Sequence, residues 1–218
     1  PPSVGYSGAV IKGPLQEAVV FLDYDGDGVL GANEPSTRTG ADGSFALTGN
    51  VEGMGFIAKT DETTIDTSSG EVLDNVVLKA PSGSAVVTPT TTIMEAANIS
   101  AEDIVAVLGL PAGVDPLSFN PYAADADPVI ALAVEKVSQQ VMTTVTAVSS
   151  AIEGSGSGAA DAFAMALETV VEVVKERAEA AKVDPTALTT VDFTNADAIS
   201  EVTSKIASKI EESGIGSA

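Results

Sequence analysis

Acidic side chains stand at positions 23, 25, 27 and 34 of the stretch Asp-Tyr-Asp-Gly-Asp-Gly-Val-Leu-Gly-Ala-Asn-Glu, residues 23–34. This stretch matches the calcium-loop pattern D-x-[DN]-x-[DN]-G-x5-E at every defined position. Ca²⁺ is a hard cation that takes about six to eight oxygen ligands. The ligands predicted by the spacing are the carboxylates of Asp23, Asp25, Asp27 and Glu34 and the backbone carbonyl of Val29.

The remaining loop positions also fit a cation site. Gly28 stands where the chain must turn sharply and a Cβ atom is unfavourable, and Gly31 stands where a bound water completes the ligand shell. Asp-Gly pairs also occur in ordinary acidic turns. A turn alone does not explain the full pattern, because crowded carboxylates without a cation repel one another. We therefore expect bound Ca²⁺.

The flanks of the loop indicate the kind of calcium site. An EF-hand has a helix on each side of its loop. Here residues 18–22, AVVFL, are typical of a strand, and residues 35–40, PSTRTG, do not favour a helix. The chain contains one such loop, not a pair. The sequence thus predicts a structural calcium site in a β-domain, not a sensor.

Composition excludes several functions. The 218 residues carry 10 basic and 31 acidic side chains, and the net charge of −21 argues against binding to nucleic acid or anionic membranes. Cys and His are absent, which removes disulfides, thiol chemistry and the usual zinc ligands. No apolar run approaches the roughly 20 residues needed to span a bilayer. The opening Pro-Pro-Ser suggests a piece of a longer chain.

Residues 1–87 are expected to form a small antiparallel β-sandwich that carries the calcium loop. Short β-branched and aromatic runs alternate there with glycine-containing turns, the pattern of about six or seven strands. The runs that predict strands are 8–12, 18–22, 44–47, 55–59 and 72–78.

Residues 8–47 also carry a family resemblance. They combine a G-x-V-x-x-G-P-L opening, a strand ending V-F-L-D, the acidic loop with its E-P exit, and the motif T-x-A-D-G-x-F. In these features the segment resembles small β-sandwich modules of bacterial surface proteins, of the Cna-B, prealbumin-like or carboxypeptidase-regulatory-like type. The resemblance implies calcium on the same four carboxylates. Some relatives form Lys–Asn isopeptide bonds, for which Lys12 and Asn75 are the candidates here, although no local pattern supports such a bond.

Residues 88–218 are expected to form an α-helical bundle, with helices over about 91–98, 100–108, 128–153, 160–181 and 196–212. Apolar residues recur at intervals of three and four along the long segments, which predicts buried faces. The buried face of the first long helix is predicted to hold Ile130, Val134, Val137, Val141, Val145, Val148 and Ile152. Short connections favour an intramolecular bundle over a coiled-coil dimer, so we expect a monomer.

The 160–181 helix carries a group of regularly spaced acidic residues. Glu168, Glu172, Glu176 and Glu179 lie near one face of this helix. A di-iron site in a helical bundle also needs Glu-x-x-His motifs, and the chain has no His. We therefore expect a solvated face.

The order of sandwich and helices suggests a setting. Residues 8–153, including KAPSGSAVVTPTTTIM and VLGLPAGVDPLSFNPYAADADP, are similar to segments of large, acidic, calcium-rich bacterial adhesins of the repeats-in-toxin type. The resemblance implies an extracellular or bacterial cell-surface location, with neighbouring domains of a longer chain as partners.

Two non-catalytic functions follow from these features. The first is a calcium-stabilised structural or spacer module of an adhesin. The alternative is a head domain that binds a sugar or peptide through Phe119 and Tyr122 in the loop 111–127, although both rings could instead fill a gap between sandwich and bundle. An enzyme is not expected, because the sequence has no nucleophile elbow, no His and no phosphate-binding glycine loop.

Overall fold

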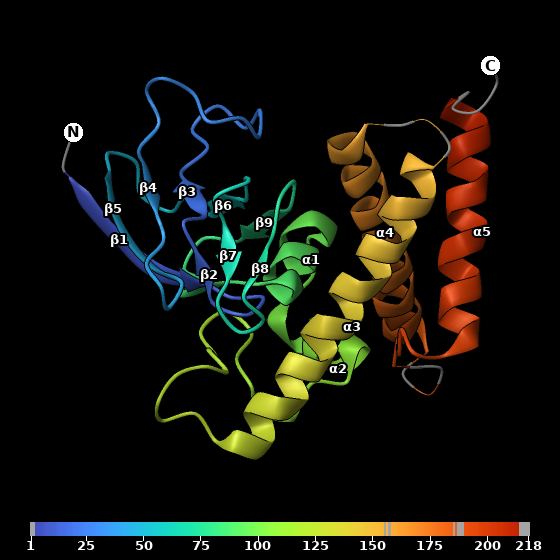
Figure 1. The fold of residues 1–218 in the computed structure, drawn as a ribbon. Helices are drawn as coiled ribbons and strands as arrows, with labels where there is room; N and C mark the ends of the chain where they lie inside the picture. The colour runs from blue at the N-terminus through green and yellow to red at the C-terminus, as the bar shows by residue number, and fades with distance from the viewer. Residues whose placement is uncertain (1–2, 155, 157, 185, 187–189, 214–218) are drawn as a thin grey trace.

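The protein is an α+β protein in which strands precede helices (Figure 1). The computed structural model describes residues 3–154, 156, 158–184, 186 and 190–213. Its strands are β1 (Val4–Val10), β2 (Leu15–Gln16), β3 (Val19–Phe21), β4 (Ser36–Arg38), β5 (Ser44–Gly49), β6 (Phe56–Lys59), β7 (Ile65–Asp66), β8 (Glu71–Val72), β9 (Val77–Ala80) and β10 (Val86–Val87). Its helices are α1 (Pro89–Ala97), α2 (Ala101–Leu108), α3 (Pro128–Glu153), α4 (Ala159–Val183) and α5 (Ala196–Ser213). The fold class expected from the sequence is confirmed.

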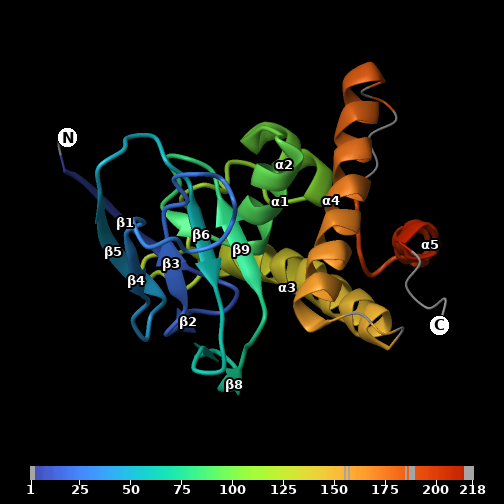
Figure 2. The ribbon, with the colours of Figure 1, turned by 90° about the horizontal axis from the view of Figure 1, so that it is seen from above.

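The strands form three small sheets, with the orders β4-β3-β6-β9, β10-β1-β5 and β2-β7-β8. All described pairs of strands are antiparallel except β1 with β10. Figure 2 shows β1 and β5 on one side of β3 and β6. The rings of Phe45 on β5 and Phe56 on β6 meet edge to face between these sheets, with centroids 5.0 Å apart. The two larger sheets therefore face each other across an apolar interior.

Two predicted strands differ from the observed ones. The first strand, expected over 8–12, is Val4–Val10, because its partner β5 pairs with it from Val4↔Gly49 to Ala9↔Ser44. The expected strand 72–78 is broken into β8 and β9, which belong to different sheets. The break falls at Asn75, whose φ of 59° lies in the left-handed region and interrupts an extended chain.

The helix ends follow local signals in the sequence. Thr88 caps α1 by accepting a hydrogen bond from Thr91 N at 3.0 Å, so this helix begins at Pro89, two residues before the predicted start. Ser100 caps α2 in the same way, and Gly109 ends it with a φ of 64°. Asp127 caps α3, which begins at Pro128.

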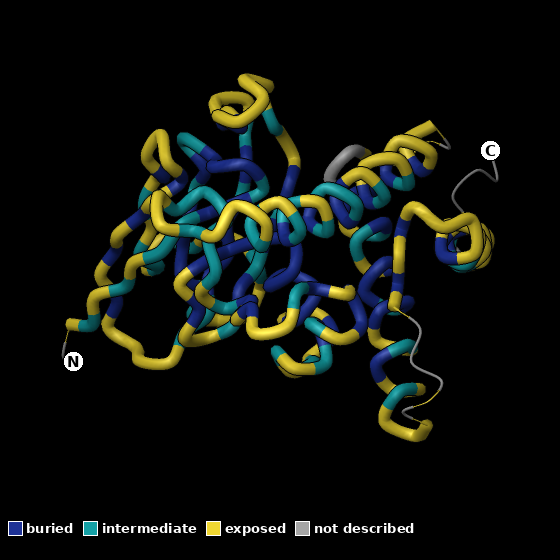
Figure 3. The backbone as a smooth tube through the Cα atoms, turned by 90° about the horizontal axis from the view of Figure 1, so that it is seen from below, coloured by how far each residue is buried: buried dark blue, intermediate teal, exposed yellow. Residues whose placement is uncertain are grey.

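The buried side chains form one continuous apolar cluster that extends from the sandwich into the helices. Figure 3 shows buried residues inside the sandwich and on the sides of the helices that face one another. Polar contacts join the two parts as well: Lys79 N on β9 donates to Thr92 Oγ1 at 2.9 Å, and Thr91 Oγ1 donates to Lys79 O at 2.8 Å. Helix α1 is thus attached directly to the edge strand of the larger sheet.

The predicted apolar faces of the long helices are largely buried. Along α3 the residues Val134, Val141, Val145 and Ile152 are buried, and the other predicted members pack against the same cluster. The spacing of Ile199, Val202, Ile206 and Ile210 predicts the apolar face of the last helix, and Ile199 is the exception on it, because this residue is 45% exposed. Helix α5 contacts the bundle through residues further along, including Val202 and Ile206.

Candidate metal-binding loop and the joint between sandwich and helices

The acidic loop joins β3 to β4, which are antiparallel neighbours in the four-stranded sheet. A hydrogen bond of 3.2 Å from Leu22 N to Pro35 O closes its base, next to the pair Phe21↔Ser36. A strand therefore enters the loop, as predicted, and another strand leaves it. The loop is a long hairpin connection, so its ends are fixed by the ladder of the sheet.

Backbone amides fold the first half of the loop around Asp23. Its Oδ1 accepts a hydrogen bond from Gly26 N at 2.7 Å, and its Oδ2 accepts one from Gly28 N at 2.8 Å. Both glycines have left-handed backbones, with φ values of 77° and 72°. A residue with a Cβ atom would be strained at these positions. The two glycines thus allow the tight turn that the sequence pattern predicts.

Three carboxylates converge in this turn. One carboxylate oxygen from each of Asp23, Asp25 and Asp27 can be chosen so that all three lie within 4.8 Å of one another. Within the described part of the chain, no other group of three or more acidic residues meets this condition. Three negative charges at this spacing repel one another, and a divalent cation would offset that repulsion.

Glu34 lies at the other end of the loop and is not part of the aspartate cluster. Its Oε1 accepts a hydrogen bond from Tyr24 N at 2.5 Å, and its Oε2 accepts one from Gly31 N at 2.8 Å. Glu34 thereby ties the end of the loop to its beginning. A carboxylate has about four lone-pair sites, so these two bonds leave acceptor capacity for a cation.

Val29 lies between the cluster and Glu34. Its N–H donates to Asp27 Oδ1 at 2.6 Å, while its carbonyl oxygen accepts no hydrogen bond from a described residue. The side chain is 58% exposed, so it contributes little to the core. The donor set of the loop consists of oxygen atoms only, which suits a hard cation such as Ca²⁺ and not a softer transition metal.

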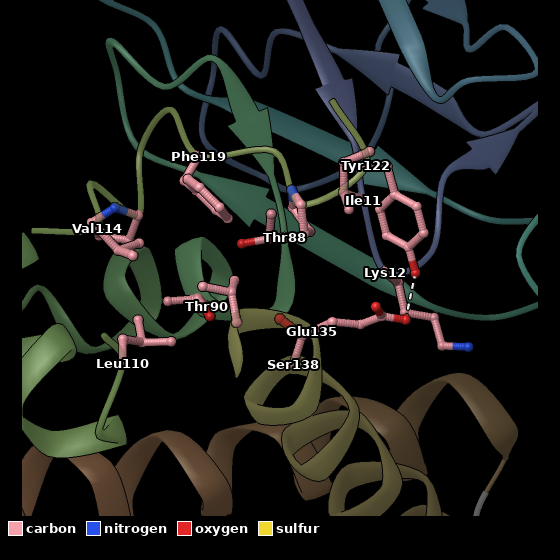
Figure 4. Close-up of a pocket in the computed structure, with 13 residues that line it drawn as sticks. Ile11, Lys12, Thr88, Thr90, Leu110, Val114, Phe119, Tyr122, Glu135 and Ser138 are labelled. Atoms are coloured by element: carbon pink, nitrogen blue, oxygen red, sulfur yellow. Dashed lines mark hydrogen bonds between the residues drawn. The ribbon is translucent and has the colours of Figure 1, made fainter. Parts of the chain in front are cut away.

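The second candidate region is a pocket between the sandwich and the helices (Figure 4). Phe119 and Tyr122 line it from the loop 111–127. Other lining residues come from the end of β1, the start of α1 and α3: Ile11, Lys12, Thr88, Thr90, Val134, Glu135 and Ser138. The space open to the centre of a water molecule is about 20 Å³, which is enough for water but not for a sugar ring.

Both aromatic rings are held by the protein itself. Phe119 packs against the core cluster. The Tyr122 hydroxyl donates to Glu135 Oε1 at 2.8 Å. Burial raises the pKa of Tyr122 to about 12, and the hydrogen bond to Glu135 acts in the same direction. The two rings therefore fill the gap between the sandwich and α3, which is the second of the two interpretations considered for them.

A buried ion pair lies beside this pocket. Lys12 Nζ is 2.9 Å from Asp66 Oδ2, and the side chain of Asp66 is 2% exposed. Ser68 N and Ser68 Oγ both donate to Asp66 Oδ1, at 3.0 and 2.6 Å. Burial by itself raises the pKa of Asp66, but these hydrogen bonds and Lys12 outweigh it, so the pKa lies below its ordinary value. Lys12 and Asn75 were the candidates for an isopeptide bond. Lys12 is paired with Asp66 instead, and Asn75 lies exposed in the turn between β8 and β9.

The acidic face of α4 is the face on which α5 docks. Lys205 Nζ lies 3.0 Å from Glu172 and 2.8 Å from Glu176, and Lys209 Nζ lies 3.2 Å from Glu168. The expectation of a solvated face is therefore only partly right: the side chain of Glu168 is 70% exposed, but that of Glu172 is 39% exposed and lies against the lysines of α5. Their pairing with lysines of α5 had no signal in the sequence other than the regular spacing of the charges.

Comparison with known proteins gives no relatives: no family model matches the chain, and neither a curated protein nor a solved structure matches it significantly. Among the described helices, none is both long and apolar enough to cross a membrane.

Proposed function

We propose that the protein is a non-catalytic, calcium-stabilised structural or spacer module of a large bacterial surface or secreted adhesin. The observation that carries this proposal is the convergence of Asp23, Asp25 and Asp27 in a loop fixed at both ends by β3 and β4. The resemblance of residues 8–47 to β-sandwich modules of surface proteins supports the same conclusion. Neighbouring domains of a longer chain are then its partners, and its location is extracellular.

The three aspartates, Glu34 and the carbonyl of Val29 would hold the cation, which offsets the negative charge of the loop. With the ion bound, the hairpin connection would lose conformational freedom and become harder for proteases to enter. A ligand present at about 100 times its Kd stabilises a folded protein by about 2.7 kcal/mol. That is a large share of the roughly 5–15 kcal/mol by which proteins are stable.

The packing of Phe119 and Tyr122 favours a spacer over a ligand-binding head. A sugar-binding ring must present its face to solvent, whereas Phe119 packs on the core and Tyr122 is bonded to Glu135. A glycan and peptide array probed with the calcium-loaded protein separates the two functions. Consistent absence of binding would support the spacer, and specific binding would support the head.

Calorimetric titration with CaCl₂ tests the proposal directly. We expect one binding site, and a melting temperature that falls by about 5–10 °C when a chelator is added. Asp25→Ala should abolish both the binding heat and the chelator effect. Glu95→Gln is the matched control, because it removes one exposed negative charge from α1, away from the loop sequence. A melting curve that is the same with and without chelator would end the proposal.

A further inference from the structure

The pocket beside Phe119 contains a polar atom that the protein does not satisfy. Thr90 is 3% exposed, and its Oγ1 has no hydrogen-bond partner among the described residues. Among the described residues, it is the only fully buried side-chain nitrogen or oxygen atom that lacks a hydrogen-bond partner. A buried hydroxyl without a partner costs about 1–3 kcal/mol, so such an atom calls for a ligand.

The same residue also has a free backbone donor. Thr90 stands in the first turn of α1, where amide groups have no acceptor within the helix. The Thr88 side chain caps Thr91 N and leaves Thr90 N without an acceptor among the described residues. Thr90 therefore combines an unpaired hydroxyl with an unpaired amide at the start of a nine-residue helix.

A second hydroxyl lies in the wall of the same pocket. Ser138 lines it from α3, is 7% exposed, and its Oγ makes no hydrogen bond with a described residue. Figure 4 shows the side chains of Thr90 and Ser138 on the same side of the pocket, with Phe119 and Tyr122 across from them. The pocket thus offers two hydroxyl groups inside a largely apolar wall.

We propose that this pocket is a built site for one ordered water molecule, bound by Thr90 and Ser138. The space open to the centre of a water molecule is about 20 Å³, and a buried water needs about 10–15 Å³ and two to four polar partners. An organic ligand does not fit this space. An anion is disfavoured because the carboxylate of Glu135 lines the same pocket, and the charge of Lys12, which also lines it, is offset by Asp66 at 2.9 Å.

The water would serve as part of the joint between the two halves of the molecule. Thr90 belongs to α1, which is attached to β9, whereas Ser138 belongs to α3, which carries Glu135 and its bond to Tyr122. A water bound to both hydroxyls connects the helix next to the sandwich with the first long helix of the bundle. This role is independent of the acidic loop and of the proposed calcium site.

A crystal structure of the intact chain at about 1.8 Å resolution tests the site directly. We expect one peak within about 2.6–3.2 Å of Thr90 Oγ1. The peak should persist in Thr90→Ser, which keeps the hydroxyl, and disappear in Thr90→Val. An empty pocket in the wild-type protein would overturn the proposal. So would an anomalous signal at this position after a bromide soak, because it would identify an anion site.

Thermal unfolding gives a second test in which the two possibilities have opposite signs. If the water is bound, Thr90→Val removes its partner and should lower the melting temperature by about 2–4 °C. If the hydroxyl is unsatisfied, the same variant removes a buried polar group and should raise the melting temperature, which would contradict the proposal. The control is Thr169→Val, since Thr169 is fully buried but its Oγ1 donates to Met165 O at 2.8 Å within α4. We expect a change below about 2 °C for this control.

Discussion

Lys12 Nζ lies 2.9 Å from Asp66 Oδ2, and this ion pair joins the end of β1 to β7, 54 residues further along the chain. The two side chains are 17% and 2% exposed, so water screens their interaction weakly. The pair also lies next to the pocket that Tyr122 closes, because Lys12 lines that pocket. It therefore holds together the region where the sandwich meets the helices.

Removing Lys12 should destabilise the protein strongly. Lys12→Met leaves the carboxylate of Asp66 buried without its cation, and breaking a buried pair in this way costs about 3–5 kcal/mol. Arg38→Met is the matched control, because Arg38 and Asp61 form a pair whose side chains are 43% and 39% exposed. Exposed pairs contribute about 0–1 kcal/mol. Urea unfolding of both variants measures the loss in the free energy of unfolding. Equal losses would show that the Lys12–Asp66 pair contributes no more than an exposed pair.

Acid should weaken the same contact. The pKa of Asp66 is lower in the folded protein than its ordinary value, so the folded state favours the charged carboxylate. The resulting stabilisation is complete above the unfolded pKa of about 3.9 and is lost as the pH falls through the lower folded-state pKa. In Asp66→Asn this part of the acid dependence should be missing. Urea unfolding between about pH 5 and pH 2 would show an unchanged slope if Asp66 did not contribute.

Tyr122 should make the protein sensitive to alkali. The pKa of Tyr122 is raised to about 12, above the value of about 10 for an unfolded tyrosine. The neutral hydroxyl therefore contributes stability that is complete below about pH 10 and is lost as the pH rises through about 12. A phenolate absorbance titration should show one late step, and Tyr122→Phe should remove it. A wild-type titration without that step would contradict the packing of Tyr122 against Glu135.

Features that depend on neighbouring residues were predicted well from the sequence. The acidic loop was predicted from its spacing, its preceding strand from the residue types of 18–22, and the start of α3 at Pro128 from helix-start signals. These features depend on contacts within about a dozen residues along the chain, so the local sequence determines them. The buried faces of α3 and α4 were also predicted, because the helical period fixes which side chains share a side.

Features that depend on distant contacts were missed. The parallel pairing of β1 with β10 brings Ala9 beside Val86, and no local pattern indicates it. The break at Asn75 was missed although Asp74 and Asn75 are turn-forming residues, because the β-branched and apolar residues on both sides outweighed this local signal. The pairing of Lys12 with Asp66 and the unpaired hydroxyl of Thr90 likewise follow from the way the two halves pack. In the candidate site, the separation of Glu34 from the aspartate cluster was not predicted either.

Two substitutions in the acidic loop should have opposite effects when calcium is removed. Asp25→Asn takes one charge out of the cluster and keeps an oxygen to accept the 3.2 Å bond from Asp27 N, so the calcium-free protein should become slightly more stable. Glu34→Gln leaves Tyr24 N or Gly31 N without a carboxylate acceptor and should cost about 1 kcal/mol in the same buffer.

With calcium present, both variants should be less stable than the wild type, because each removes a proposed ligand. Thermal unfolding in chelator and in about 5 mM CaCl₂ measures both conditions. The sign change of Asp25→Asn between the two buffers is the diagnostic result. If this variant were less stable in chelator as well, the aspartates would be held by contacts other than mutual repulsion, and the charge argument for a cation would fail.

The charged contacts between α4 and α5 should respond to salt. Lys205 lies within 3.0 Å of Glu172 and 2.8 Å of Glu176, and these hydrogen bonds raise the pKa of Lys205. We expect Lys205→Met to lose about 1 kcal/mol at low ionic strength, since each partly exposed pair contributes about 0.2–1 kcal/mol. At 1 M NaCl the screening length is only about 3 Å, so the loss should shrink.

Lys175→Met is the control for net charge. Lys175 is exposed on α4 and makes no ion pair with a described residue, so its replacement adds the same net negative charge without removing a contact. General repulsion in a protein of charge −21 weakens both variants alike and is screened alike. The difference between the two variants in urea unfolding at low and high salt therefore isolates the contacts of Lys205. If that difference were zero at low salt, the contacts of Lys205 would not help to hold α5 on α4, and the prediction would fail.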